Sequence, residues 1–356
     1  MRQSLFFAFL HLYLDLAISL HNSGRCHLAS TKKVRWGIIG CGDVTEVKSG
    51  PAFRKAENSD LVAVMRRNGE LAKDYARRHD VPTWYDDADK LIDDRNVDAV
   101  YVATPPGSHA EYAIKTVAAG KPVYVEKPMA RSYAECESML EASEKAGVGL
   151  YVAYYRRALP SFIKTKELIA SGAIGKVRYV STELVSPPSR EDVEGPMRWR
   201  VKPDFSGGGY FFDLGSHLLD YLDLLFGPIE EAAGRAANQA GLYEPEDLVM
   251  ANYKLPGGIQ GSGVWCFTAG VAAAVDSTKV VGDCGELTFG TFDFRPVRLA
   301  NDSGVEEYDF PVPQHVQQPL VQTIVDELRG IGTCPSTGSS AARTSKIMDE
   351  IVGRSP

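Results

Sequence analysis

The chain has 356 residues, of which 44% are hydrophobic and 24% are charged, and its formal net charge is −7. This length favours two domains, and an acidic balance without a long basic run argues against a nucleic-acid partner. The six cysteines have neither CxxC nor zinc-ligand spacing, so we expect no metal site.

The first 31 residues differ from the rest of the chain. Residues 5–20 are largely apolar behind a single basic residue, Arg2, as in the core of a signal peptide. Polar residues interrupt the run, no clear cleavage site follows it, and it is too short to cross a membrane. We therefore expect residues 1–31 to form a leader or a disordered extension. The protein is expected in the cytoplasm without stable membrane association, with organellar targeting or secretion as alternatives.

Residues 32–153 alternate between strand and helix patterns. Apolar runs at residues 34–40, 61–65, 97–103, 122–125 and 148–153 are separated by helix-like stretches at 70–79, 88–93, 109–119 and 133–146. Strands that are apolar throughout are buried on both faces, and helical spacers suit right-handed crossovers. We predict an α/β Rossmann domain here, with a parallel sheet.

The pattern changes after residue 153. Helices are expected at residues 160–171, 209–226, 317–330 and 341–352, and strands at 176–184, 248–255, 259–267, 277–281, 286–289 and 296–299. Pro256-Gly257-Gly258 is typical of a hairpin turn between two of these strands. We predict a substrate-binding α+β domain over residues 154–356, with an open, mainly antiparallel sheet. Its closing helices are expected to pack back on the first domain.

A glycine-rich run, Gly40-Cys41-Gly42-Asp43-Val44, lies where the first predicted strand meets a helix. In such turns the first glycine permits a tight bend, and the second lets the backbone approach a pyrophosphate at the helix N-terminus. Thr45 occupies the third position of this fingerprint, where Gly or Ala is usual. We predict that residues 40–44 bind a dinucleotide.

The end of the second strand indicates which dinucleotide. A site that prefers NAD has a carboxylate there for the ribose hydroxyls. This chain instead has Arg66 and Arg67, and its nearest acid, Asp60, stands at the beginning of the strand. Guanidinium groups suit a 2′-phosphate, so we predict NADP(H) in preference to NAD(H). The alternative is that both arginines are surface charges.

The third predicted strand ends in Thr104-Pro105, followed closely by His109. Ligands bind at the carboxyl ends of parallel strands in such sheets. We therefore predict that Thr104 and Pro105 contact the cofactor. His109 is also included, although a role at the start of the following helix is the commoner one.

A lysine, an aspartate and a histidine form the predicted catalytic set. Lys127 follows a short apolar strand in Glu126-Lys127-Pro128, where its ammonium can stabilise developing alkoxide charge and Glu126 can orient it or contact the cofactor. Asp213 and His217 are four residues apart in an expected helix, so they share one face. His217 can exchange a proton with a substrate hydroxyl, and Asp213 can orient its ring or bind the substrate.

These motifs together resemble the Gfo/Idh/MocA family of glucose–fructose oxidoreductases and inositol dehydrogenases. The resemblance rests on residues 40–42, 104–109, 126–128 and 207–217, in the family's order and spacing. It implies NAD(P)-linked oxidation or reduction of a sugar, anhydrosugar, cyclitol or diol. It also implies a homodimer or homotetramer formed through the C-terminal sheet.

The resemblance also indicates where a small polyhydroxylated substrate binds. The segment that begins at Tyr154 is similar to one that enters the substrate pocket in relatives, so Tyr154, Arg156 and Arg200 are predicted substrate contacts. Surface or interface roles are the alternative. Two other functions fit the same fold, a non-catalytic NAD(P)-binding sensor and a glycoside hydrolase that recycles its nicotinamide. Retention of Lys127 and His217 argues against the sensor.

Overall fold

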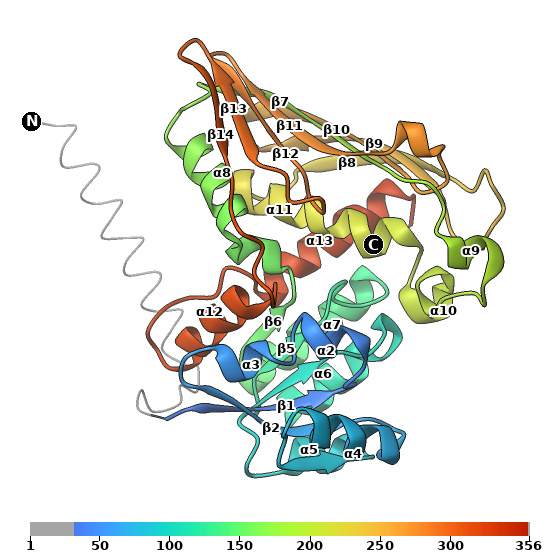
Figure 1. Ribbon diagram of the computed structural model, residues 1–356, viewed down its shortest axis with the longest axis vertical. Coiled ribbons are helices and arrows are strands. Elements are labelled where there is room, and N and C mark those ends of the chain that lie inside the picture. Colours follow the sequence, from blue (N-terminus) through green and yellow to red (C-terminus); the bar gives the residue numbers. More distant parts are fainter. Residues whose placement is uncertain (1–31, 355–356) are drawn as a thin grey trace, which may run out of the picture.

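The computed structural model describes residues 32–354, so the predicted leader at residues 1–31 lies outside the described residues. The described chain forms two sheets joined by helices, with the first half of the sequence at the bottom of Figure 1 and most of the second half at the top. None of the helices within residues 32–354 is long and apolar enough to span a membrane.

The first sheet has six parallel strands. These are β1 (Val34–Ile39), β2 (Ser59–Met65), β3 (Thr83–Tyr85), β4 (Ala99–Val102), β5 (Val123–Val125) and β6 (Leu150–Val152). Their order in the sheet is β3-β2-β1-β4-β5-β6, and every pair is parallel. The strands β4, β5 and β6 are buried at every position, which explains their continuous apolar sequences.

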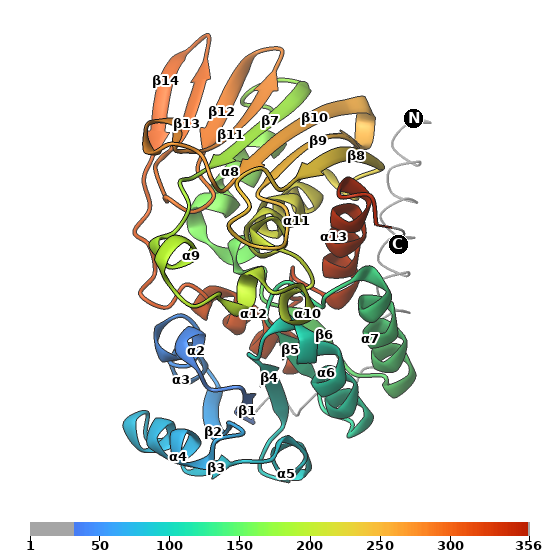
Figure 2. The same cartoon turned by 90° about the vertical axis from the view of Figure 1, so that its right-hand side faces the viewer.

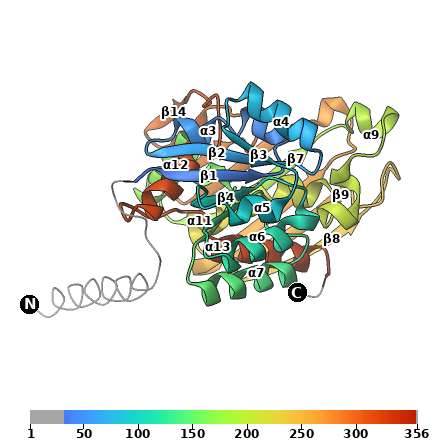
Figure 3. The same ribbon diagram turned by 90° about the horizontal axis from the view of Figure 1, so that it is seen from below.

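Helices cover both faces of this sheet, as Figure 3 shows. They are α2 (Asp43–Val47), α3 (Ala52–Lys55), α4 (Gly69–Arg78), α5 (Ala88–Asp93), α6 (His109–Ala118) and α7 (Tyr133–Ala146). The helices α5, α6 and α7 pack in a row on one face, and α3 and α4 lie on the other. Gly147 ends α7 in the left-handed conformation, which a glycine adopts without steric cost.

The second sheet has eight strands and is mainly antiparallel. These are β7 (Val177–Val185), β8 (Glu231–Ala237), β9 (Leu248–Leu255), β10 (Ile259–Cys266), β11 (Val275–Gly282), β12 (Gly285–Phe289), β13 (Val297–Asn301) and β14 (Gly304–Tyr308). Their order is β14-β13-β12-β11-β7-β10-β9-β8, and only the β7–β10 pair is parallel. The strands fan across the top of Figure 2. Both sheets confirm the predicted fold class.

Long helices pack beneath one face of the second sheet. They are α8 (Pro160–Ala170), α11 (Ser216–Phe226) and α13 (Gly338–Ile351), and shorter helices, α9 (Arg190–Glu194) and α10 (Pro203–Ser206), lie at one end. Burial alternates along β9, as expected for a strand with helices on one side only. The helix α13 contacts α7, α11 and β8, while α12 (Gln318–Leu328) contacts α3, so both closing helices touch the first half of the chain.

The predicted helix at residues 209–226 is not continuous. Residues Phe211–Gly215 form a π-helical turn, and α11 begins only at Ser216. The glycines before the turn are tightly packed, since a Cβ on Gly208 would lie 2.2 Å from the Phe212 ring. The segment that carries Asp213 and His217 is therefore a π-helical turn that continues directly into a regular α-helix.

Candidate active site

A cavity of about 980 Å³ lies between the two halves of the molecule. Its wall includes residues just beyond the carboxyl ends of β1, β2, β4 and β5, together with residues 199–217 and Phe292 from the second half. The strands β1 and β4 are neighbours at the point where the strand order reverses, which is where open α/β sheets bind ligands.

The glycine turn forms one end of the cavity. Gly40 has φ +92°, and a Cβ there would lie 2.8 Å from the Thr104 side chain, so the turn requires glycine. At Gly42 an added Cβ would meet nothing closer than 3.9 Å, which leaves the backbone open to a ligand. Asp43 and Val44 also lie on the wall. These features fit the pyrophosphate of a dinucleotide.

Cys41 was predicted to contact the cofactor, and the structure corrects this prediction. It lies within the same turn, but its side chain is fully buried in the core and does not line the cavity. Burial raises the pKa of its thiol to about 11. Its backbone N–H donates to the Met65 carbonyl at 3.2 Å, so Cys41 helps to join β1 to β2.

Arg66 and Arg67 both lie on the cavity wall at the end of β2. Within residues 32–354 neither guanidinium has an ion-pair partner. Asp60 stands at the opposite end of β2, where it lies 3.8 Å from Arg54. The two cations are therefore free to receive an anionic group.

Thr104 and Pro105 line the cavity, but His109 does not. The His109 ring is fully buried, with Nε2 2.7 Å from the Thr104 carbonyl and Nδ1 3.1 Å from the Pro128 carbonyl. Burial lowers its pKa, so the ring is neutral at physiological pH. The prediction of a direct cofactor contact is corrected accordingly. The ring packs between the loops of Thr104 and Pro128, and in its neutral form it donates to only one of the two carbonyls.

Three charged groups meet on the wall beyond β5 and form what we call the cavity cluster, Lys127, Asp213 and Arg200. The Lys127 ammonium donates to the Asp213 carbonyl at 2.8 Å and also to the carboxylate oxygen Oδ1. The Arg200 Nε lies 3.1 Å from the other oxygen, Oδ2. Burial opposes ionisation of Asp213, but the two cations outweigh it and lower the pKa of the carboxyl. The Lys127–Pro128 peptide bond is cis.

His217 lies on the same wall, at the start of α11, and is only 2% exposed. The rings of Tyr154, Tyr155 and Phe292 approach it edge-on. Burial, reinforced by nearby cations, holds its pKa well below 6.5, so the imidazole is neutral at pH 7. Its Nδ1 has no hydrogen-bond partner in the described part of the chain. Asp213 does not orient this ring, because its carboxylate is shared between Lys127 and Arg200.

Tyr154 and Arg156 were predicted to contact the substrate, but neither lines the cavity. Tyr154 is fully buried behind His217, and Arg156 is 1% exposed with its Nε 2.7 Å from the Thr291 carbonyl. The Arg156 guanidinium also stacks 4.4 Å from the centre of the Phe292 ring. Both residues support the wall from behind, and Arg200 alone of the three predicted contacts reaches it.

Several wall residues escaped sequence reasoning. Tyr155 and Phe292 bring aromatic surface beside His217, and Lys48 brings a further cation. Gln317 comes from the segment before α12 and donates to Glu126, which also accepts from the Tyr101 hydroxyl. Glu126 is thus a fixed part of the wall beside Lys127. Only the neighbours of predicted positions, such as Tyr155, carried any signal in the sequence.

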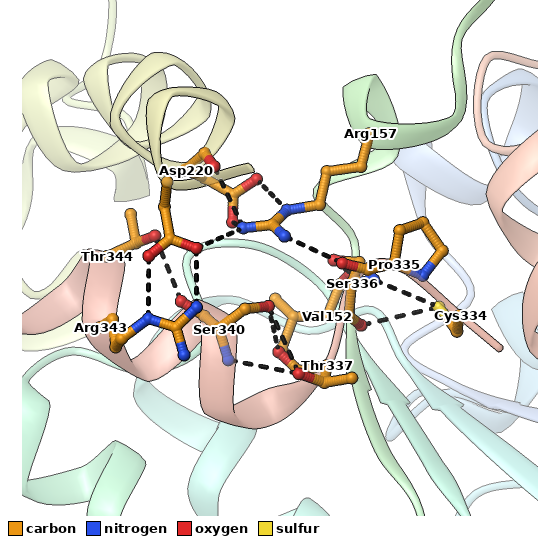
Figure 4. Close-up of polar contacts among 11 residues, drawn as sticks. Val152, Arg157, Asp220, Cys334, Pro335, Ser336, Thr337, Ser340, Arg343 and Thr344 are labelled. Carbon is orange, nitrogen blue, oxygen red and sulfur yellow. Dashed lines mark hydrogen bonds and ion pairs between the residues drawn. The ribbon is translucent and has the colours of Figure 1, made fainter. Parts of the chain in front are cut away.

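A second set of charges lies beneath α11, away from the cavity, and is buried except for Arg343, whose side chain is 42% exposed. We call Arg157, Asp220, Asp223 and Arg343 the sealed cluster. Arg157 donates from Nε to Asp220 at 2.7 Å, and Arg343 donates to Asp223 at 2.7 Å, as drawn in part in Figure 4. Arg157 also donates to the Pro335 carbonyl at 2.9 Å, and Ser336 donates to the Val152 carbonyl at 2.7 Å. These contacts tie α11, which carries His217, to α13 and β6.

Two family models match the chain. The model described as an oxidoreductase family with an NAD-binding Rossmann fold matches residues 34–154, and the GFO/IDH/MocA C-terminal domain matches residues 162–288. Within residues 32–354 there is no group of three or more His, Cys, Asp or Glu side chains placed to hold a metal ion.

Individual proteins are similar over most of their length. Oxidoreductase P35 of Formosa agariphila is 38% identical over 324 residues, which are 90% of this chain and 99% of that protein. Trans-1,2-dihydrobenzene-1,2-diol dehydrogenase of Sus scrofa is 26% identical over 85% of both chains. A structure of levoglucosan dehydrogenase with NADH and levoglucosan superposes with a TM-score of 0.81 at 22% identity, covering 90% of this chain and 96% of the other.

Proposed function

The chain belongs to the Gfo/Idh/MocA family of oxidoreductases, and on that premise we propose that it is an NADP(H)-dependent dehydrogenase of a polyhydroxylated small molecule. The observation that supports this most is the arrangement of one continuous cavity. It begins at the glycine turn and ends where Lys127, Asp213 and His217 meet. A dinucleotide and a small substrate can therefore lie in line, with the reacting carbon beside Lys127.

The cofactor supplies the hydride acceptor or donor when it is bound. Lys127 has three N–H donors, of which two are directed at Asp213, so a third is free for a substrate oxygen. This ammonium stabilises negative charge on that oxygen as it develops. Because Asp213 accepts two of the donors, it fixes the direction of the third.

His217 moves the proton in this scheme. Its ring is neutral at pH 7, so a nitrogen with a free lone pair can accept the proton of a substrate hydroxyl during oxidation. The aromatic rings around it exclude water from the far side of the imidazole. In the reverse direction the protonated ring returns the proton to the alkoxide.

The preference for NADP(H) rests on Arg66 and Arg67. Both lie on the wall near the glycine turn, without an acid at the end of β2 for the 2′-hydroxyl of NAD. A charge-assisted hydrogen bond to the 2′-phosphate contributes about 1.5–3 kcal/mol, so NADP should bind at least about tenfold more tightly than NAD. The NADH that accompanies levoglucosan dehydrogenase belongs to a protein of 22% identity and does not fix the cofactor here.

Cofactor titrations test this preference. We expect the Arg66→Ala, Arg67→Ala double variant to lose most of its affinity for NADP and little of its affinity for NAD, as followed by quenching of protein fluorescence. Arg77→Ala, on the exposed side of α4, is the matched control and should change neither affinity. Equal affinity of the wild type for NADP and NAD would contradict the proposal.

The substrate class can be tested by an absorbance screen for NADPH over sugars, anhydrosugars, cyclitols and diols. A diol is included because one relative is named as a dihydrobenzenediol dehydrogenase, and an anhydrosugar because one structural neighbour is named as a levoglucosan dehydrogenase. A net change in NADPH absorbance with at least one compound is expected. Release of a sugar from a glycoside without any net change would instead indicate a hydrolase that recycles its nicotinamide.

A further inference from the structure

Lys48 is an exposed lysine whose backbone is fixed while its ammonium is free. It follows α2 and lies on the cavity wall. Its carbonyl accepts from the Gln317 N–H at 3.3 Å, and the preceding Val47 carbonyl lies 2.6 Å from His315 Nδ1. Within residues 32–354 the ammonium itself has no hydrogen-bond or ion-pair partner. The backbone of Lys48 is therefore held at the cavity wall, and its ammonium is available to a ligand in the cavity.

The positive charge of Lys48 acts at the end of the cavity where Lys127 and His217 lie. It acts on the His217 ring together with the charges of Arg156 and Lys127, and all three lower the pKa of the imidazole. The hydrogen bonds place Lys48 at the same end, because its carbonyl accepts from Gln317, whose side chain donates to Glu126 beside Lys127.

None of the acids near this end, within residues 32–354, pairs with Lys48. Asp213 is shared between Lys127 and Arg200, and Glu126 accepts hydrogen bonds from Tyr101 and Gln317. Asp204 also lines the cavity, but its side chain is exposed on α10. Asp276, whose carboxylate accepts from the Thr291 and Phe292 N–H groups, faces Arg156. Lys48 is therefore the cation near the imidazole that has no acid partner within residues 32–354.

We propose that Lys48 binds an anionic group of the substrate, so that the substrate is a sugar bearing a carboxylate or a phosphate ester. The inference rests on the proposed function and narrows its substrate class. A lysine ammonium is a compact, strongly hydrated cation, and it interacts with either kind of oxyanion as a point charge. Recognition by Lys48 would place the anionic group on the α2 side of the cavity, while the reacting hydroxyl lies between Lys127 and His217.

Calorimetric titration of the NADPH-bound protein tests this without requiring turnover. The probes are D-glucose, D-glucuronate and D-glucose 6-phosphate, with D-galactose and D-galacturonate as a second set. In the wild type we expect at least one anionic compound to bind about tenfold or more tightly than its neutral counterpart, as expected for a charged hydrogen bond. The compound that binds identifies the anion as carboxylate or phosphate.

Two variants locate the effect. Lys48→Met keeps the length of the side chain and removes its charge, so the advantage of the anionic compound should largely disappear. Lys73→Met replaces an exposed lysine of α4 that does not line the cavity and should keep the advantage. Equal affinity for charged and neutral sugars in the wild type, binding of neither anion, or an advantage that survives in Lys48→Met would each overturn the inference. Loss of NADPH affinity in Lys48→Met with an unchanged preference would overturn it too, by assigning Lys48 to the cofactor.

This outcome is separable from that of the proposed function. Selective binding of an anionic sugar with no NADPH absorbance change on any compound would contradict the dehydrogenase and leave the role of Lys48 standing. Turnover of neutral sugars alone would support the dehydrogenase and contradict the role of Lys48.

Discussion

The segment from Phe211 to Phe226 carries two ion clusters that use the same chemistry for different ends. In the cavity cluster, Asp213 joins Lys127 and Arg200, whose side chains are 14% and 40% exposed. In the sealed cluster, Asp220 joins Arg157, and both side chains are no more than 3% exposed. The Asp213 carboxylate holds Lys127 and Arg200 where a ligand can reach them. The Asp220 carboxylate holds Arg157 where only other groups of the protein can reach it.

This difference in access teaches what each cluster can do. The cavity cluster has a donor on Lys127 left over for a ligand, so its charges are available to chemistry. The sealed cluster uses its donors internally, on Asp220, Asp223 and the Pro335 carbonyl. The sealed cluster therefore positions α11 against α13, and α11 carries His217. Damage to the first should abolish turnover, and damage to the second should destabilise the fold.

The largest expected effect is on stability, from Arg157→Met. Removal of the guanidinium leaves the Asp220 carboxylate buried without its partner, which typically destabilises a protein by about 3–5 kcal/mol. The free energy of unfolding, from urea denaturation followed by circular dichroism, measures it. Asp74→Asn breaks an exposed pair on α4 and is the control, with no measurable change expected.

A double variant shows whether the loss comes from the stranded charge. In Arg157→Met with Asp220→Asn the buried carboxylate is also removed, so about 1–3 kcal/mol of stability should return. If Arg157→Met unfolded at the same urea concentration as the wild type, the sealed cluster would not hold the fold together.

Next in size is the loss of turnover in Lys127→Ala. Removal of one donor to a developing oxyanion lowers turnover by about 10²–10³-fold in comparable sites. NADP should still bind, and the urea midpoint should stay close to that of the wild type, since Asp213 keeps Arg200 as its partner. Initial rates of NADPH formation on a substrate found by the screen give the measurement.

Lys121→Ala is the matched control for Lys127→Ala. Lys121 precedes the same strand, β5, at its opposite end, and donates to the Asp94 carbonyl at 2.7 Å, away from the cavity. Its turnover should equal that of the wild type. Near-normal turnover in Lys127→Ala would remove the lysine from the mechanism.

The fold was predictable from the sequence where strands are buried and not where they lie at an edge. The central strands of the first sheet are predictable because helices on both faces make them apolar throughout. Those of the second sheet are predictable from alternation, because one face is buried. The strands β3, β8 and β14 were not predicted, and all three lie at the edges of the two sheets. The fourth edge strand, β6, was predicted because it is buried at every position. Each of the three unpredicted strands is partly or largely exposed and carries no long apolar run; β8, for example, is EAAGRAA and almost wholly exposed. Pairing partners, not local sequence, decide these strands.

The site was predictable where a glycine or a strand end fixes the backbone. Gly40, Thr104 and Lys127 lie on the cavity wall because parallel strands bring their carboxyl ends together. Which side chain of a turn faces the cavity is decided by packing, so Cys41 and Tyr154 turned inward to the core. Gln317 was beyond reach for another reason, since it meets Glu126 across 191 residues of sequence.

The smallest expected effect is a shift in the pH dependence of oxidation, which reports the protonation of His217. This residue lies beside the cavity cluster and on the helix that the sealed cluster positions. The imidazole must be neutral to accept a proton, so the rate of oxidation should fall as the pH drops through its pKa. Burial and three cations hold that pKa below 6.5, so kcat/KM should stay level from about pH 8 to about pH 6.5 and decline only below it. Lys48→Met removes one of the cations, which should raise the pKa and move the acid limb upward. Lys73→Met should leave the limb in place. A wild-type limb centred above pH 7, or one that Lys48→Met does not move, would mean that the imidazole is not the titrating base.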